Sequence, residues 1–189
     1  MARSGVPEAE VPYVTSVVEL MELLRGSRDD RALRTAALLR RSHPADKELQ
    51  LAGLLHDMGQ MLRPGDGARH AVLAAEAVRP LLGERVARLV RLHAPAGAAD
   101  GADGADGPGG DADAVATLRQ ARETAAACGL DAGVLEDWRP LLELVAAGAR
   151  RAAGNAIDPL GLPRGSVPGP GGRGAGRGAG ATSSPERSP

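Results

Sequence analysis

The stretch SHPADKELQLAGLLHDMGQML (42–62) decides the fold class that this sequence predicts. Its apolar residues recur every three or four positions, which is the period of an amphipathic α-helix, so we expect one helix from about Asp46 to Leu62. Leucines and methionines occupy one side of a helical wheel, and the other side holds a compact polar group that includes Gly53, His56, Asp57 and Gln60. Surface helices usually carry lysine and glutamate there, so this side is expected to face a cleft.

The same helical period continues along most of the chain. Further helices are expected near residues 14–25, 30–41, 69–82, 84–94, 113–127 and 137–153, with Asp137 as the N-cap of the last one and Pro80 shortening or kinking the helix that contains it. No segment shows the alternation of a β-strand. The chain has no Phe, one Tyr and one Trp, so its core must be aliphatic. These features predict an all-α fold, a compact helical bundle.

Composition divides the chain into parts. Residues 1–12 are expected to form a loose arm, 13–153 the helical domain and 154–189 a disordered tail rich in Gly, Pro, Arg and Ser. Within the domain, the Gly/Ala/Asp run at 97–112 predicts a flexible loop. Its aspartates lack the Gly and Glu placement of a calcium loop, so we interpret the run as a solvated linker.

Charge and cysteine content limit the partners that we expect. The net charge is −1 and the pI about 6.4, so no global field favours nucleic acid or a membrane surface. The single cysteine, Cys128, excludes an internal disulfide and suits a reducing compartment. No segment has the ~18 apolar residues that a membrane span requires. The sequence therefore predicts a soluble cytoplasmic protein without nucleic-acid or membrane partners.

Two of the four histidines, His70 and His93, fall on apolar stripes of expected helices, and His56 lies on the polar side that is expected to face a cleft. His56, His70 and His93 would each turn an imidazole inward, whereas His43 precedes a proline in a connection and is expected at the surface. An unpaired buried polar group costs ~1–3 kcal/mol, and a metal ion shared with Asp57 would satisfy all three rings at once. The alternative is that they are ordinary core residues, each with its own hydrogen-bond partner.

A His-Asp pair followed by two further histidines on a helical chain resembles the HD-domain superfamily. RTAALLRRSHPADKELQLAGLLHDMGQML (34–62) is most similar to the mixed-valence diiron oxygenases, the branch with inositol oxygenase and the HD oxygenases of phosphonate degradation. RHAVLAAEAVRPLLGERVARLVRLHA (69–94) continues the resemblance, and the segment 117–146 is similar to the C-terminal helices of that branch. The resemblance spans roughly residues 30–150.

The resemblance implies a set of six metal ligands, of which four are present: His56, Asp57, His70 and His93. Arg31 stands at the position of the first histidine and Arg122 at that of the last aspartate. Glu123, beside Arg122, would point about 100° away on a helix. Gln60 stands at a substrate-binding position. Because a guanidinium cannot ligate a metal, we expect one ion per chain, with iron favoured and manganese or another divalent metal as alternatives.

Three functions follow as hypotheses, and whether the protein is an enzyme stays open between them. The first is an oxygenase relative with an impaired or mononuclear site that binds a small polar, phosphorylated or phosphonate ligand. The second is an active metal-dependent phosphohydrolase acting on a small phosphorylated substrate. The third is a non-catalytic binding or scaffold protein.

Overall fold

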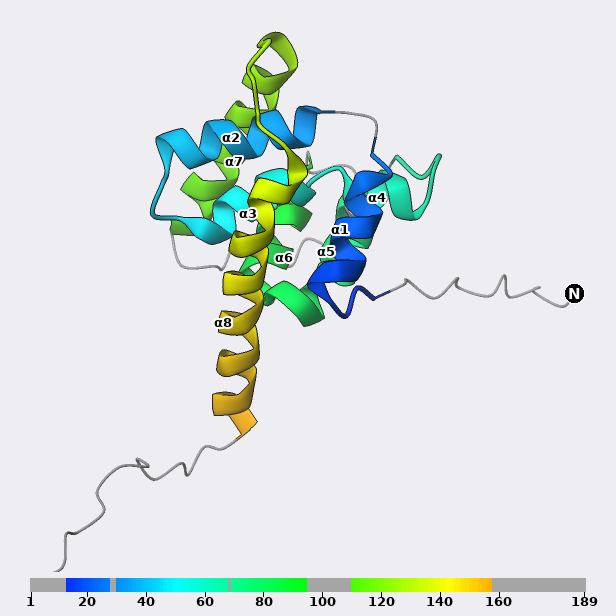
Figure 1. Ribbon diagram of the computed structural model, residues 1–189, viewed down its shortest axis with the longest axis vertical. Helices are drawn as coiled ribbons and strands as arrows, with labels where there is room; N and C mark the ends of the chain where they lie inside the picture. The colour runs from blue at the N-terminus through cyan, green and yellow to red at the C-terminus, as the bar shows by residue number, and fades with distance from the viewer. Residues whose placement is uncertain (1–12, 28–29, 68, 95–109, 158–189) are drawn as a thin grey trace, which may run out of the picture. The chain divides into compact units, whose positions relative to one another are not determined.

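The computed structural model describes residues 13–27, 30–67, 69–94 and 110–157, and within these ranges the chain is helical without any strand (Figure 1). The elements are α1 (Val17–Arg25), α2 (Arg31–Ser42), α3 (Lys47–Leu55), α4 (Met58–Leu62), α5 (His70–Leu82), α6 (Glu84–Leu92), α7 (Gly110–Ala127), η1 (Leu135–Trp138) and α8 (Arg139–Ile157). The predicted all-α fold is confirmed. The expectations for the arm at 1–12, for residues 97–109 and for the tail from 158 fall outside the described residues.

The helix expected from Asp46 to Leu62 is wrong as one continuous element. Asp46 does begin it, since its carboxylate accepts a hydrogen bond from the Leu49 backbone N–H at 3.0 Å. The chain then turns at His56 and Asp57, which separates α3 from α4. The turn lets α4 pack directly against the start of α5, as the contact between Gly59 and the His70 backbone shows.

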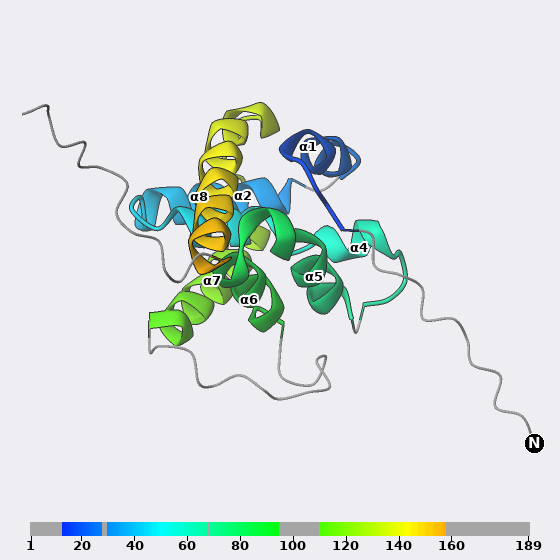
Figure 2. The same ribbon diagram turned by 90° about the horizontal axis from the view of Figure 1, so that it is seen from below.

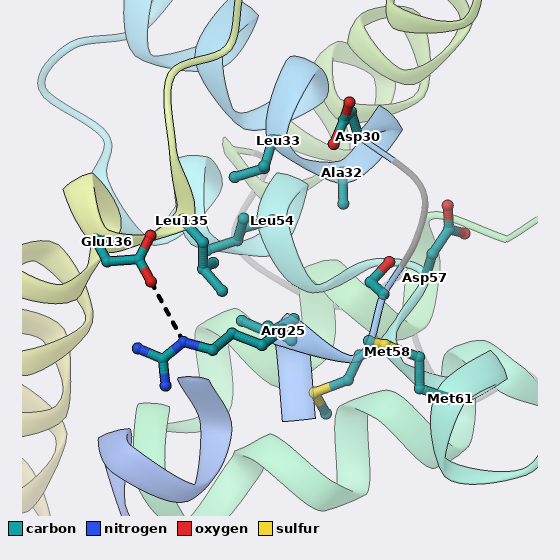
Figure 3. Close-up of a pocket in the computed structure, with 12 residues that line it drawn as sticks. Arg25, Asp30, Ala32, Leu33, Leu54, Asp57, Met58, Met61, Leu135 and Glu136 are labelled. Carbon is teal, nitrogen blue, oxygen red and sulfur yellow. Dashed lines mark hydrogen bonds and ion pairs between the residues drawn. The ribbon is translucent and has the colours of Figure 1, made fainter. Parts of the chain in front are cut away.

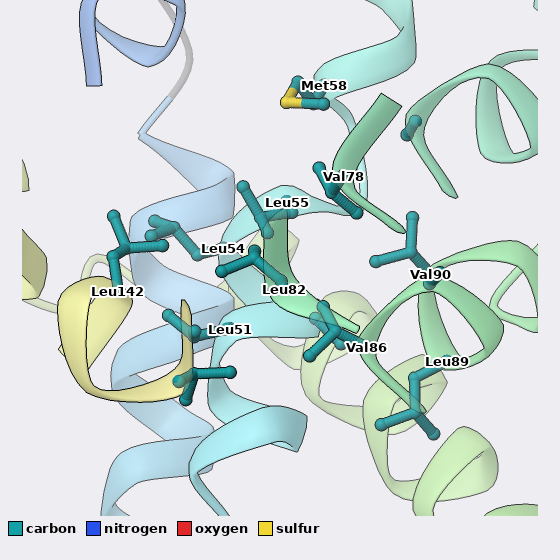
Figure 4. Packing of buried hydrophobic residues seen from close by; sticks show 14 of the residues in the cluster. Leu51, Leu54, Leu55, Met58, Val78, Leu82, Val86, Leu89, Val90 and Leu142 are labelled. Atoms are coloured by element: carbon teal, nitrogen blue, oxygen red, sulfur yellow. The ribbon is translucent and has the colours of Figure 1, made fainter. Parts of the chain in front are cut away.

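Helix α3 lies at the centre of the core (Figure 4). Every residue from 49 to 55 is buried, and the helix packs on α2, α6, α7 and α8. The polar side expected to face a cleft is therefore divided: Gly53 and His56 are packed in the core, whereas Asp57, which follows α3, is partly exposed. Gly53 contributes to this close packing because it has no side chain. A Cβ at this position would lie 2.6 Å from Leu39 Cδ1, so glycine permits α2 to approach α3 closely.

Helices α5 and α6 lie side by side and are joined at Gly83, whose φ of 89° favours glycine (Figures 1 and 2). Pro80 lies in the last turn of α5, which continues to Leu82. Because the chain reverses at Gly83, His70 at the start of α5 and His93 after α6 lie at the same end of this helical pair, with 5.5 Å between their ring centroids. None of the described helices is long and apolar enough to span a membrane.

Helix α7 begins earlier than the sequence indicates, at Gly110 rather than Asp113. Asp111 is only 6% exposed, and it accepts hydrogen bonds from Arg85 Nε at 3.3 Å and Arg88 Nε at 2.8 Å. For this residue the interpretation as solvated linker is wrong. Arg85 also donates to Asp46 at 2.7 and 2.8 Å, so one guanidinium connects the beginnings of α3 and α7 through α6.

The C-terminal helix also differs from expectation. Asp137 lies in the 3₁₀ turn η1 and accepts from the Val134 N–H at 3.3 Å, so it does not cap α8. Helix α8 begins at Arg139 and extends to Ile157, beyond the expected boundary at residue 153. Trp138 is buried beneath the Arg40 guanidinium, which lies 3.6 Å from the ring centroid.

Candidate metal centre

Three histidines lie at helix ends and share one local arrangement. His56 follows α3, His70 begins α5 and His93 follows α6. In each, ring Nδ1 lies within hydrogen-bond distance of the backbone carbonyl oxygen three residues earlier, at 2.8, 2.6 and 2.5 Å respectively. Because a carbonyl only accepts, Nδ1 carries the proton and Nε2 keeps a free lone pair. This is how proteins orient histidines that bind metals through Nε2.

The three Nε2 atoms are buried and have no hydrogen-bond partner among the described residues. The same is true of Asp57 Oδ1. Each unsatisfied atom of this kind costs ~1–3 kcal/mol, and four of them gather in one region. All four atoms offer an electron pair and none carries a proton, so hydrogen bonds between them cannot form. A cation, in contrast, would satisfy these atoms by accepting their electron pairs.

Asp57, His70 and His93 form the closest group. Each offers one donor atom, and the three atoms lie within 4.8 Å of one another. Ligands about 2.1 Å from one shared ion lie at most about 4.2 Å apart, so small side-chain rotations would close the group around an ion. The residues present thus fit a single divalent metal.

The fourth expected ligand, His56, is not a member of this group. Its Nε2 lies 2.9 Å from Asp57 Oδ2, although the pair lacks hydrogen-bond geometry. The His56 ring also packs edge-on against that of His93, with 5.3 Å between centroids. His56 is therefore placed to orient both the carboxylate and one imidazole of the group.

The protonation states suit metal binding. Burial lowers the pKa of His93 to about 4, opposed by its hydrogen bond to the Val90 carbonyl and helped by the positive charge of Arg122. Burial alone would raise the pKa of Asp57, but nearby positive charge, that of Arg122 included, holds it below its usual value. At neutral pH His93 is neutral and Asp57 is ionised, as ligands must be.

Helix α7 carries two arginines toward this region. Arg119 donates to the backbone carbonyl oxygens of Leu92 and His93 at 2.6 and 3.1 Å, which holds the end of α6 that carries the ligand. Arg122 lies one turn further along, half-buried, and its charge acts on both Asp57 and His93. Among the described residues Arg122 makes no hydrogen bond or ion pair.

The other residues singled out from the sequence lie in different settings. Arg31 is the first residue of α2 and is half-buried, whereas Gln60 on α4 and Glu123 on α7 are both exposed. His43 is exposed as expected. Nothing brings Gln60 or Glu123 into the group of donor atoms.

Sequence reasoning missed Gly59 and Arg119. A Cβ on Gly59 would lie 1.8 Å from the His70 backbone oxygen, so only glycine lets α4 lie against the residue that carries this ligand. The available signal was a glycine inside an apolar helical run, which often marks close backbone packing. Arg119 gave no signal, because its partners are backbone carbonyls on another helix.

A cavity of about 210 Å³ opens beside Asp57, walled by α1, the start of α2, the end of α3, α4 and η1 (Figure 3). Asp57 is the residue that the cavity and the donor group share. A ligand in the cavity would therefore contact one residue of the donor group.

A family model described as HD domain matches residues 28–133, more than half of the chain. The chain belongs to the HD-domain family. HD domains form a superfamily of metal-dependent hydrolases, and the matched range contains His56, Asp57, His70 and His93. The expected membership is confirmed, while the closer relationship to diiron oxygenases stays a prediction. No curated protein and no solved structure matches the chain.

Proposed function

We propose that this HD domain binds one divalent metal ion through Asp57, His70 and His93 and hydrolyses a phosphate ester of a small molecule. The observation that carries the proposal is the group of buried donor atoms, within 4.8 Å of one another and without hydrogen-bond partners. Three protein ligands leave coordination positions open, as in catalytic rather than structural metal sites.

Two imidazoles and one carboxylate suit iron or manganese, and we favour iron. When bound, such an ion supplies a Lewis acid that polarises phosphorus–oxygen bonds and lowers the pKa of a water ligand. Two positive side chains, Arg31 and Arg122, stand where the resemblance to diiron oxygenases places a second metal's ligands. We therefore propose one ion rather than two.

Arg122 is the residue that we assign to the substrate's phosphate. It is half-buried, has no described partner, and its charge reaches two residues of the donor group. A planar guanidinium binds two phosphate oxygens at once, with charge-assisted hydrogen bonds about twice as strong as neutral ones. Its role is to orient the phosphate and to neutralise charge that develops on it.

Turnover and binding together test this proposal. Protein purified without a histidine tag is loaded with Fe²⁺, Mn²⁺ or Co²⁺ and assayed against phosphomonoesters and phosphodiesters. Turnover should vanish in Asp57→Ala and fall about a hundredfold in Arg122→Gln, with partial recovery in Arg122→Lys. Arg122→Gln should also weaken binding of inorganic phosphate in calorimetry. The control is Arg91→Gln, which removes a half-buried arginine from α6. Metal-loaded protein without turnover of any ester would contradict the proposal.

An oxygenase is the second candidate, because two histidines and one carboxylate also form the ligand set of mononuclear non-haem iron oxygenases. The resemblance of residues 34–62 favours a phosphonate as its substrate. Oxygen consumption by the Fe²⁺-loaded protein in the presence of a small phosphonate, without phosphate-ester hydrolysis, would favour this candidate. Failure of every metal to raise the melting temperature would leave the scaffold role.

A further inference from the structure

The cavity beside Asp57 is lined mainly by aliphatic side chains. They come from five elements: Leu24 of α1, Leu33 of α2, Leu54 of α3, Met58 and Met61 of α4, and Leu135 of η1 (Figure 3). Dividing its 210 Å³ by the ~30 Å³ that a water molecule occupies in the liquid gives room for about seven non-hydrogen atoms.

No aromatic ring is placed to stack on a nucleobase in this cavity. The chain has only two aromatic residues of the Phe, Trp and Tyr type. Tyr13 lines a separate surface groove, and Trp138 is buried beneath Arg40. Because base recognition commonly relies on aromatic stacking, the cavity lacks what a nucleoside would use.

The charges around the cavity also disfavour an anion inside it. Among the described residues of its wall, Arg25 is the cation, and Glu136 engages it at 3.3 Å (Figure 3). The other charged residues described in the wall are Asp30 and Asp57, both acidic. A phosphate group would be repelled by these carboxylates, whereas a metal ion held by Asp57, His70 and His93 and the charge of Arg122 would attract it to the donor group.

We infer that the cavity binds the uncharged aliphatic part of the substrate, so that the preferred substrate is a phosphomonoester of a short alkyl alcohol. The inference rests on the proposed function for the position of the phosphate. Burying a methylene contributes ~0.8 kcal/mol, which corresponds to about a fourfold gain in affinity for each added carbon. The gain should stop at about six or seven carbons, when the cavity is full.

A homologous series tests the inference. The metal-loaded protein is assayed with alkyl monophosphates from methyl to decyl and with nucleoside monophosphates. The value of kcat/KM should rise about fourfold per carbon up to hexyl or heptyl and then level off. Ala32→Leu, which fills the cavity from its α2 wall, should reduce the preference for hexyl over methyl at least tenfold. The matched control is Ala126→Leu on the exposed side of α7, which should leave the preference unchanged.

Binding separates failure of this inference from failure of the proposed reaction. Calorimetry with methylphosphonate and hexylphosphonate measures occupancy without turnover. If no ester is hydrolysed but hexylphosphonate binds more tightly and Ala32→Leu removes the difference, the cavity inference stands and the reaction fails. If esters are hydrolysed without dependence on chain length, or nucleotides are preferred, the cavity inference is overturned and the reaction stands.

Discussion

Replacing Gly59 with alanine should displace His70 and weaken metal binding, although Gly59 itself has no ligand atom. An alanine Cβ at this position would lie 1.8 Å from the backbone oxygen of His70 and 2.8 Å from its Cα. These are backbone atoms, so no side-chain rotation relieves the overlap. An ordinary contact begins near 3.4 Å, so α4 and the start of α5 must separate by about 1.6 Å.

That displacement is large compared with the tolerance of a metal site. Metal–ligand distances stay within about 0.2 Å of their standard values. A shift of about 1.6 Å therefore removes His70 from coordination unless its side chain adopts another rotamer. We expect at least a tenfold loss of metal affinity. Overpacking by one methyl group in a close contact also costs about 1–3 kcal/mol, so the free energy of unfolding should fall by that amount or more.

Calorimetric titration with Mn²⁺ and urea unfolding of the metal-free protein measure the two effects separately. Gly148→Ala provides the matched control, because a Cβ at this glycine in α8 meets nothing within 4 Å. It should leave metal affinity unchanged and raise the free energy of unfolding by up to about 1 kcal/mol through helix propensity. Wild-type metal affinity and stability in Gly59→Ala would refute the reasoning.

Three further predictions concern stability. The hydrogen bond from Arg85 lowers the pKa of Asp46 below 3.8 in the folded protein. Because the pKa in the folded state lies below that in the unfolded state, this interaction stabilises the fold fully above about pH 4. The stabilisation is lost as the pH falls through the folded-state pKa. Urea unfolding should therefore show Asp46→Asn less stable than wild type by about 1 kcal/mol at pH 7, with the difference shrinking below pH 4, and a difference independent of pH would argue against the linkage. Asp111→Asn leaves Arg85 without one of its carboxylate partners and should cost about 1–3 kcal/mol in denaturant unfolding, whereas an unchanged midpoint would mean that this ion pair is not formed in solution. Gly83→Ala forces a side chain into a φ of 89° and should cost about 1–3 kcal/mol, seen as a lower Tm; an equal or higher Tm would show that this turn has a different conformation.

The sequence predicted the helices of this fold where a local period and a local boundary signal agree. Helices α5 and α6 begin within one residue of the expected positions, and Gly83 separates them as a glycine between two apolar periods would. The inward direction of His70 and His93 followed from the same period. Such features depend on residues three or four positions apart, which the sequence contains directly.

What the sequence did not predict depends on contacts between distant segments. A helical wheel assumes one straight helix, so it missed the turn at His56 and Asp57 that lets Gly59 reach the backbone of His70. It also assumes one solvent-facing side, whereas α3 is buried all round. Asp111 looked like part of a solvated run because its partners, Arg85 and Arg88, lie more than twenty residues away.

The candidate site was predictable in kind but not in arrangement. The sequence indicated His56, Asp57, His70 and His93 as one set, and the structure groups Asp57 with His70 and His93 while His56 lies against Asp57. The cavity had no sequence signal, since five separate elements contribute its walls.

Metal stoichiometry measured on untagged protein tests the proposed centre most directly. Elemental analysis after loading with Fe²⁺ or Mn²⁺ and gel filtration should give one ion per chain, and calorimetry should give a single site. His70→Ala and His93→Ala should abolish binding, while His43→Ala, which removes the exposed histidine, should retain it. At a hundred times Kd the metal should stabilise the wild type by about 2.7 kcal/mol. A chain that binds no metal, or that loses it equally in His43→Ala, would contradict a centre built on Asp57, His70 and His93.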